Sequence, residues 1–322
     1  MGRNTHSICW LLPIVLASGL AGSARMQEPP AIRVGVDLVR VSATVTNARG
    51  DFIPNLRKED FQIFDDGTEV AIDFFAATEE PARVLVLVET GPAVYLISQQ
   101  HLAAAQLLFA GLAADDEVAL ASYSNTPTLQ LDFTQDKRAA LNALITPQFS
   151  LGSADLRLTA SLSPLLEWLA SAPGKKSIVL LSTGLDANDA AQEQLRRQLR
   201  STEVSIYAVA LGGSLRKQPS SKKTALNEHA AYVTEGFARA DTRLREFAEL
   251  TGGRAFFPAD ESELKRAYQQ IAGALRHQYR LGFPAPHRDG RSHMIEVRLR
   301  HHAPSNARPH RVYARKGYVA PG

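Results

Sequence analysis

Three apolar runs, the third interrupted only by Ser205, are separated by segments with helical periodicity and constrain the fold of this chain more than any other feature. They cover residues 84–88, 178–181 and 204–211. A strand that is apolar on both faces needs cover on both faces, as strands have in a parallel sheet flanked by helices. Alternation of such strands with helices favours a wound α/β topology. The sequence therefore predicts an α/β fold with a doubly wound, mainly parallel sheet.

Both ends of the chain have a different pattern, in which apolar and polar residues alternate. Residues 34–75 and 279–318 show this alternation, and Asp66-Gly67 lies between two such runs as a hairpin turn signal. Because chain ends often lie close together, we expect these strands to form one small β-sandwich-like domain with the α/β domain inserted into it. The predicted boundaries are residues 32–80 and 277–319 for the two β segments and 81–276 for the α/β domain. The polar stretch 212–236 has no apolar periodicity and is interpreted as a mobile surface loop.

The first 24 residues are typical of an export signal. Arg3 precedes an apolar run over residues 8–20, and small residues follow, which predicts cleavage near Ser23 or Ala24. The run is shorter than the roughly 20 residues of a membrane-spanning helix, so we expect a mature chain that does not span a membrane. An uncleaved signal anchor is the alternative. Cys9, the only cysteine, lies in this segment, so the mature fold has no disulfide. Periplasmic and extracellular locations both remain open.

Charge and motifs exclude several classes of function. The net charge of +3 gives no reason to expect a nucleic-acid partner. The chain contains no zinc-protease helix motif, no nucleophile elbow and no phosphate-binding glycine loop, so we expect no enzymatic activity. His301 and His302 are adjacent, and on a strand such residues point to opposite faces, so the pair is a poor metal chelate. Basic residues gather toward the C-terminal end, where we interpret them as solvated strand faces.

Four segments of the central domain resemble the core strands and loops of von Willebrand factor A domains. They read VLVLVETGPA, LTASLSPLLEWL, KKSIVLLSTGLD and VSIYAVALG. The flanking segments DFIPNLRKEDFQIFDDG, LTGGRAF, IAGALRHQYRLGF and ARKGY resemble the secreted, von Willebrand factor A-related proteins common in Acidobacteria. The resemblance runs from about Val34 to Tyr318 and implies a von Willebrand A-like fold with a binding or adhesion function.

The resemblance also implies a metal-ion-dependent adhesion site, and this chain departs from its pattern. Such a site uses an Asp-x-Ser-x-Ser loop, a threonine and a further aspartate, which supply oxygen ligands to a divalent cation. Here Glu89 stands at the first aspartate, Gly91 and Ala93 at the serines and Thr183 at the last aspartate, while Thr159 matches. We therefore expect a degenerate site without cation or other cofactor. The alternative is Mg²⁺ or Ca²⁺ held by Glu89, Thr159 and a nearby aspartate, Asp186 or Asp155. Without metal, Glu89 is expected to be solvated or paired with a basic side chain.

Loops at the carboxyl ends of the strands are the expected binding surface, since ligands of open α/β sheets bind there. These loops cover residues 89–95, 152–159 and 183–188. The candidate residues are Glu89, Thr90, Gly91, Thr159, Thr183 and Asp186. We predict an exported, non-catalytic module that binds an unidentified protein through these loops. The alternative is a structural component of the cell envelope that docks through its basic β-domain, at Arg298, Arg300 and Arg311. A hydrolase is a third, weaker hypothesis, and the oligomeric state stays open.

Overall fold

A computed structural model of the chain describes residues 38–78, 80–91, 98–145, 155–187, 191–216, 226–300 and 310–322. The predicted signal segment, Ala93 and the pair His301-His302 lie outside these residues. Among the described residues, no helix combines the length and apolar character needed to cross a membrane.

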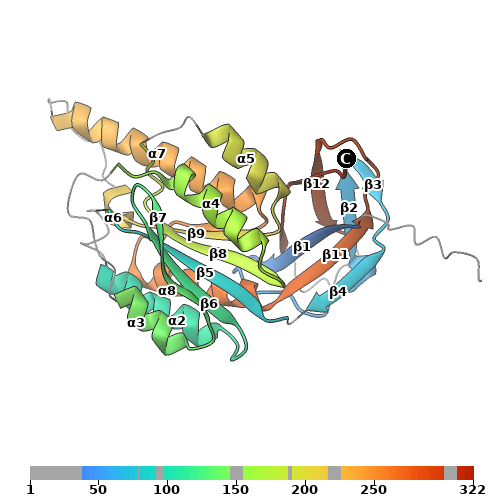
Figure 1. Cartoon of the computed structure of the whole chain (residues 1–322), viewed down its shortest axis with the longest axis horizontal. Helices are drawn as coiled ribbons and strands as arrows, with labels where there is room; N and C mark the ends of the chain where they lie inside the picture. The colour runs from blue at the N-terminus through green and yellow to red at the C-terminus, as the bar shows by residue number, and fades with distance from the viewer. Residues whose placement is uncertain are drawn as a thin grey trace, which may run out of the picture. The chain divides into compact units, whose positions relative to one another are not determined.

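A six-stranded sheet forms the centre of the α/β part, with the order β10-β9-β8-β5-β6-β7 (Figure 1). Neighbouring strands pair in parallel except at the edge, where β7 is antiparallel to β6. The strands are β5 (Ala82–Glu89), β6 (Glu117–Tyr123), β7 (Pro127–Thr134), β8 (Lys175–Ser182), β9 (Ser205–Ala210) and β10 (Ala255–Phe256). The apolar runs seen in the sequence are the inner strands β5, β8 and β9.

Helices cover both faces of this sheet, which is why its inner strands are apolar on both sides (Figure 1). The helices of one face are α2 (Ser98–Gly111), α3 (Lys137–Ile145) and α8 (Glu261–Arg276), and those of the other are α4 (Leu158–Ala170), α5 (Gln192–Ser201) and α7 (Leu226–Leu250). Alternate residues of β5 separate accordingly: Val84 and Val86 belong to the core under α2 and α8, and Leu85 and Leu87 to the core under α4 and α7. A short helix, α6 (Gly213–Arg216), follows β9.

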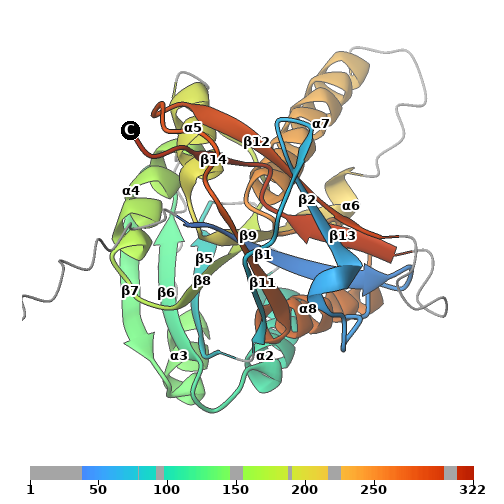
Figure 2. The ribbon, with the colours of Figure 1, turned by 90° about the vertical axis from the view of Figure 1, so that its right-hand side faces the viewer.

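Strands from both ends of the chain pair in two further sheets, with the orders β13-β1-β11-β4 and β14-β12-β2-β3 (Figure 2). Their bounds are β1 (Leu38–Asn47), β2 (Phe61–Asp65), β3 (Thr68–Val70), β4 (Phe74–Thr78), β11 (Gln278–Pro284), β12 (Ser292–Leu299), β13 (His310–Ala314) and β14 (Gly317–Val319), with a 3-10 turn at Lys58–Asp60. One shared core joins them, including Val41, Phe61, Leu281 and Ile295. The predicted fold class, an α/β sheet with a flanking β-sandwich-like domain, is confirmed.

One local prediction was wrong. Residues 212–236 were expected to form a loop, but α6 begins at Gly213 and α7 begins at Leu226. Residues 217–225 lie outside the described part. The start of α7 is rich in alanine, leucine and glutamate, which favour helix, whereas apolar periodicity reports only packing. The opposite end of α7 matches the expectation, because Gly252, two residues after the last helical residue Leu250, adopts a left-handed conformation (φ +75°).

Candidate functional site

The order of the central sheet places its topological switch point between β5 and β8. From β5 the chain first moves outward through β6 and β7, then returns to the other side of β5 for β8, β9 and β10. Loops diverge at such a point, and the carboxyl ends of the two strands form the usual ligand site of open α/β sheets. Here those ends are Glu89 and Ser182. The expected loops therefore do meet at one place.

Glu89 is completely buried, with an exposed fraction of 0%. Its Oε1 accepts a hydrogen bond from Thr183 Oγ1 at 2.9 Å. Its Oε2 accepts from Thr183 N at 2.8 Å, Ser182 Oγ at 3.0 Å and Tyr123 OH at 3.1 Å. The carboxyl group is therefore satisfied by protein donors from the ends of β6 and β8. We expected Glu89 to be solvated or paired with a basic side chain. This was wrong, because these strand ends enclose the side chain.

Burial and hydrogen bonding act in opposite directions on this group. Removal from water is the larger effect and raises the pKa of Glu89 above its usual value, while the bonds from Thr183, Ser182 and Tyr123 offset part of this increase. Burial and the neighbouring charge of Glu89 also raise the pKa of Tyr123 well above its usual value, so this phenol stays protonated and donates. A backbone N–H and three hydroxyl groups surround the carboxyl, which is an arrangement that accommodates a carboxylate.

Two arginines hold the loop that follows β8. Arg216 Nη2 donates to Thr183 O, and Arg243 Nη1 donates to Gly184 O at 2.7 Å. Arg216 also forms an ion pair with Asp241, and its guanidinium lies 4.7 Å from the ring centroid of Phe237. Desolvation lowers the pKa of Arg216 to about 10, whereas the charge of Glu89 acts in the opposite direction. The loop is thus fixed through its carbonyl oxygens, since arginine offers only donors.

Asp186 and Thr159 meet at the beginning of α4. Thr159 N donates to Asp186 Oδ2 at 2.8 Å. A carboxylate at this position satisfies a free N–H of the first helical turn and interacts favourably with the helix dipole. Thr159 itself is 1% exposed, and its Oγ1 has no hydrogen-bond partner within the described residues. Asp186 therefore acts as a helix cap.

Thr90 and Gly91 continue from β5 and are also buried. Thr90 N and Oγ1 both bond to Tyr123 O, at 2.9 and 3.1 Å. A Cβ at Gly91 would lie 3.1 Å from Leu156 Cδ2 and 3.6 Å from Glu89 Oε1. The Leu156 side chain thus lies close to the position where an adhesion site would carry its first serine, and it would have to shift to admit one.

These residues do not fit a divalent cation at Glu89. A hard cation needs about six oxygen ligands. Thr183 and Ser182 direct donors at the carboxylate, Gly91 has no side-chain oxygen, and Asp186 caps a helix. A cation at this carboxylate would have to replace the hydrogen bonds of Thr183, Ser182 and Tyr123. The structure brings Glu89, Thr183 and Gly91 together, and places the Thr159–Asp186 pair at the start of α4.

Burial decides which of the sequence candidates can touch a partner. Glu89, Thr90, Gly91, Thr159 and Thr183 are buried, and Asp186 is half-buried. They form a floor that positions the loops. The exposed described residues beside this floor are Asp155 and Ala187, and Ala187 N bonds to Leu156 O at 2.7 Å. Residues 92–95, 152–154 and 188 of the expected loops lie outside the described part.

Sequence reasoning missed Tyr123, Ser182, Arg216 and Arg243. Tyr123 and Ser182 are the last residues of β6 and β8, so a systematic reading of strand ends would have found them. Arg216 and Arg243 come from helices, and nothing in the sequence indicated that their side chains reach back to the loop after β8.

No protein-family model and no curated protein matches the chain. Several solved structures are similar in fold. A von Willebrand factor type A protein from Catenulispora acidiphila is 10% identical, with a TM-score of 0.47 over 88% of this chain and 75% of that chain. An aerotolerance-related membrane protein from Bacteroides fragilis is 14% identical, with a TM-score of 0.44 over 59% and 98%. Proximal thread matrix protein 1 from the mussel byssus is 12% identical, with a TM-score of 0.46 over 64% and 49%.

These similarities concern the fold alone. The strand order, with its switch point between β5 and β8, agrees with the sequence resemblance. The chain thus carries an α/β module with a six-stranded, mainly parallel sheet, joined to a β-sandwich that its own two ends form. Its particular feature is a buried glutamate at the position where the resemblance implies the first metal ligand.

Proposed function

We propose that this chain is an exported, non-catalytic binding module that contacts a protein partner through the loops above β5 and β8. The observation that carries the proposal is the closed network around Glu89. Protein donors take the place that a cation has in an adhesion site, so the loops keep their shape without metal. The partner is then recognised by the loop surface and not by a carboxylate that completes a metal shell.

The burial of the hydroxyl groups supports a role without catalysis. Ser182 and Thr183 each lie beside a carboxylate, which is an arrangement that could activate a nucleophile. Both residues are 0% exposed, however, so no substrate reaches them in this conformation. Their bonds to Glu89 serve the loop structure.

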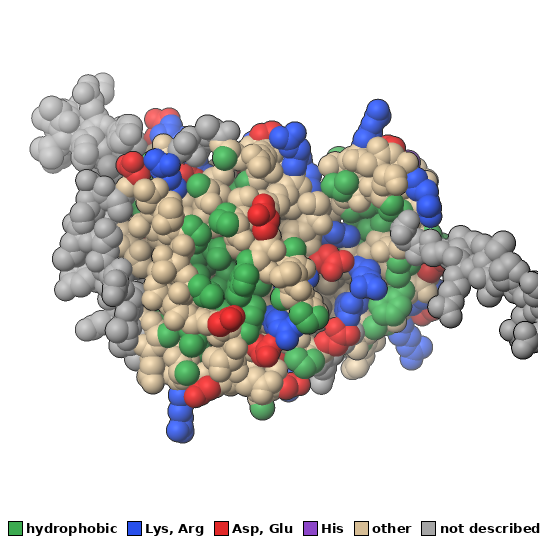
Figure 3. Space-filling view, viewed as in Figure 1, with side chains coloured by type: hydrophobic (Ala, Val, Ile, Leu, Met, Phe, Trp, Pro, Cys, Tyr) green, Lys and Arg blue, Asp and Glu red, His purple; other side chains and the backbone are tan. Residues whose placement is uncertain are grey.

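The alternative, docking through a basic β-domain, has weaker support. Arg298 pairs with Glu296, and Arg300 pairs with Glu69. On the face shown in Figure 3, basic and acidic side chains are interspersed and no large area has a single sign. Paired arginines on an exposed surface offer little net attraction to an anionic envelope component.

Site-specific crosslinking tests the proposed surface. A photoreactive amino acid is placed at Asp155 or Ala187 beside the floor, and in matched variants at Arg298 or Arg300 on β12 and after it. In the native host, both loop positions are expected to give the same adduct, and the β12 positions none. An adduct formed only from Arg298 and Arg300 would instead assign docking to the β-domain and overturn the proposal.

Mg²⁺ and Ca²⁺ are expected to leave the melting temperature of the purified chain unchanged, within about 1 °C. A ligand that binds only the native state must stabilise it, so an unchanged value indicates no binding. Thermal unfolding in chelator and then in millimolar cation measures this. A saturable increase that disappears in Thr159→Ala would show a remodelled cation site at the loops and would contradict the metal-free mechanism.

A further inference from the structure

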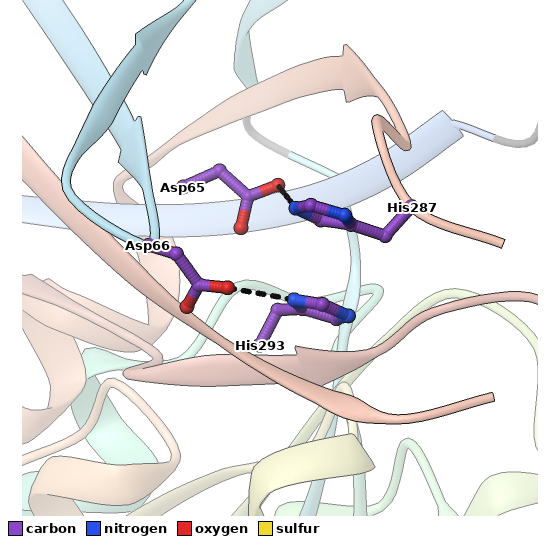
Figure 4. A group of neighbouring side chains, drawn as sticks. All are labelled: Asp65, Asp66, His287 and His293. Atoms are coloured by element: carbon purple, nitrogen blue, oxygen red, sulfur yellow. Dashed lines mark hydrogen bonds and ion pairs between the residues drawn. The ribbon is translucent and has the colours of Figure 1, made fainter. Parts of the chain in front are cut away.

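A second group of polar side chains lies in the β-sandwich, away from the central sheet. Asp65 and Asp66 come from the end of β2 and its turn, while His287 and His293 come from the loop before β12 and from β12 itself (Figure 4). One ligand atom from each of these four residues lies within 4.8 Å of all the others. The group joins the two ends of the chain, and the function proposed above does not use it.

The side chains face one another in two pairs (Figure 4). His293 Nδ1 lies 2.7 Å from Asp66 Oδ2, and His287 Nε2 lies 3.8 Å from Asp65 Oδ2. The two imidazole rings stack with centroids 4.0 Å apart and an angle of 2° between their planes. Both rings therefore direct a nitrogen toward the carboxylates, from the same side.

Asp65 provides an independent indication of a ligand. It is only 3% exposed, and Tyr318 OH donates to its Oδ2 at 2.8 Å. Its Oδ1 is buried and has no hydrogen-bond partner within the described residues. An unsatisfied buried carboxylate oxygen is costly, and such a group calls for an ion or a donor. In Figure 4 this oxygen points toward the Asp66–His293 pair.

A further carboxylate, that of Asp289, orients the His293 ring. Its second nitrogen, Nε2, lies 3.1 Å from Asp289 Oδ1. Histidines that bind metals in proteins usually direct their other ring nitrogen to a carboxylate or carbonyl, which fixes the ring and increases its basicity. Asp289 has this position relative to His293, with Nδ1 left to face the group.

The backbone holds Asp66 in place. Asp66 and Gly67 form the predicted two-residue turn, with φ of +46° and +83°. Asp66 N donates to Met294 O at 3.0 Å, and Asp66 Oδ1 accepts from Met294 N at 2.9 Å. Its other oxygen is thereby presented to His293. Three of the four side chains belong to this rigid hairpin and strand.

We propose that Asp65, Asp66, His287 and His293 bind one transition-metal dication of the Zn²⁺ type. Two imidazoles and two carboxylates suit zinc and its neighbours, whereas Mg²⁺ and Ca²⁺ prefer oxygen ligands throughout. Ligand atoms around a tetrahedral zinc lie about 3.3 Å apart, since the bonds are about 2.0–2.1 Å long. His287 is on a loop with its side chain 41% exposed, so it is the ligand that moves inward. The ion then links β2 to β12 in a chain whose single cysteine allows no internal disulfide.

Zinc binding to the full chain, purified without a histidine tag, tests the site. Competition with a chromophoric chelator is expected to show one tight equivalent, and Zn²⁺ is expected to raise the melting temperature saturably. His287→Ala and Asp66→Asn should each weaken binding by about 100-fold or more, since each removes a ligand. Asp66→Asn keeps an acceptor for Met294 N, and His287 is exposed, so both variants should fold. Co²⁺ in place of Zn²⁺ should give the visible absorption of a four-coordinate ion.

Two control variants separate this site from adventitious binding. His310→Ala, and the double variant His301→Ala with His302→Ala, remove histidines outside the group and should retain the zinc affinity of the parent chain. The proposal is overturned if the parent binds no zinc at micromolar concentration. It is equally overturned if affinity survives His287→Ala and Asp66→Asn, or is lost only with His301 and His302. None of these results depends on the loops around Glu89.

Discussion

Replacement of Glu89 by alanine is expected to lower the free energy of unfolding by about 3–5 kcal/mol. The change leaves a buried cavity and removes the acceptor of Thr183 N, Thr183 Oγ1, Ser182 Oγ and Tyr123 OH. A buried donor without a partner costs about 1–3 kcal/mol, and part of this is recovered where the hydroxyls bond to one another. Urea denaturation followed by circular dichroism, in chelator, measures the effect.

Two further variants show whether the loss of stability in Glu89→Ala comes from the hydrogen-bond network. Glu89→Gln keeps the volume and one acceptor oxygen, so it should cost less than Glu89→Ala. Glu249→Ala on the exposed side of α7 should change stability by no more than about 0.5 kcal/mol. If Glu89→Ala and Glu249→Ala proved equal, the hydrogen-bond network would not support the loops, and the metal-free mechanism would lose its basis.

Gly253→Ala is expected to reduce stability by about 4 kcal/mol or more, or to prevent folding. An added Cβ would lie 1.9 Å from the carbonyl oxygen of Ile206 and 2.6 Å from its carbon. Ile206 belongs to β9, which lies between β8 and β10, and cannot shift without disturbing its pairing with β8. Overpacking against backbone is more costly than against a flexible side chain. Soluble yield and the midpoint of urea unfolding report the outcome.

Gly273→Ala provides the matched control with the opposite sign. Gly273 lies within α8, and a Cβ there would meet nothing within 4 Å. Alanine in a helix interior is favoured over glycine by about 0.5–1 kcal/mol, so this variant should be more stable than the parent. A Gly253→Ala protein as stable as the parent would mean that the chain after α7 does not approach β9 as closely as described.

Much of the fold could be predicted because it depends on local pattern. The apolar runs of β5, β8 and β9 indicated burial on both faces, and the helical segments between them indicated a wound sheet. Asp66-Gly67 marked a hairpin turn and Gly252 a helix end, through backbone conformations that few residues adopt. The start of α7 was missed because its sequence shows no apolar periodicity, although its alanine, leucine and glutamate residues favour helix.

The position of the candidate site could be predicted from the sequence, but the groups that surround Glu89 could not. Strand ends on either side of the switch point identified Glu89 and Thr183. The degenerate adhesion site that the resemblance implies at Gly91 and Ala93 stays a prediction. Whether the Glu89 carboxyl contacts water, a basic side chain or hydroxyl groups depended on Tyr123 and Ser182, which come from other strands.

The sequence by itself determined the α/β class and the joining of both chain ends in a β-domain, because these follow from residue type and spacing. Only the tertiary structure decided that Glu89 is enclosed by donors and that Asp65 and Asp66 meet His287 and His293. Both groups combine residues far apart in the chain. Their proximity results from strand pairing and core packing, which no short stretch of sequence encodes.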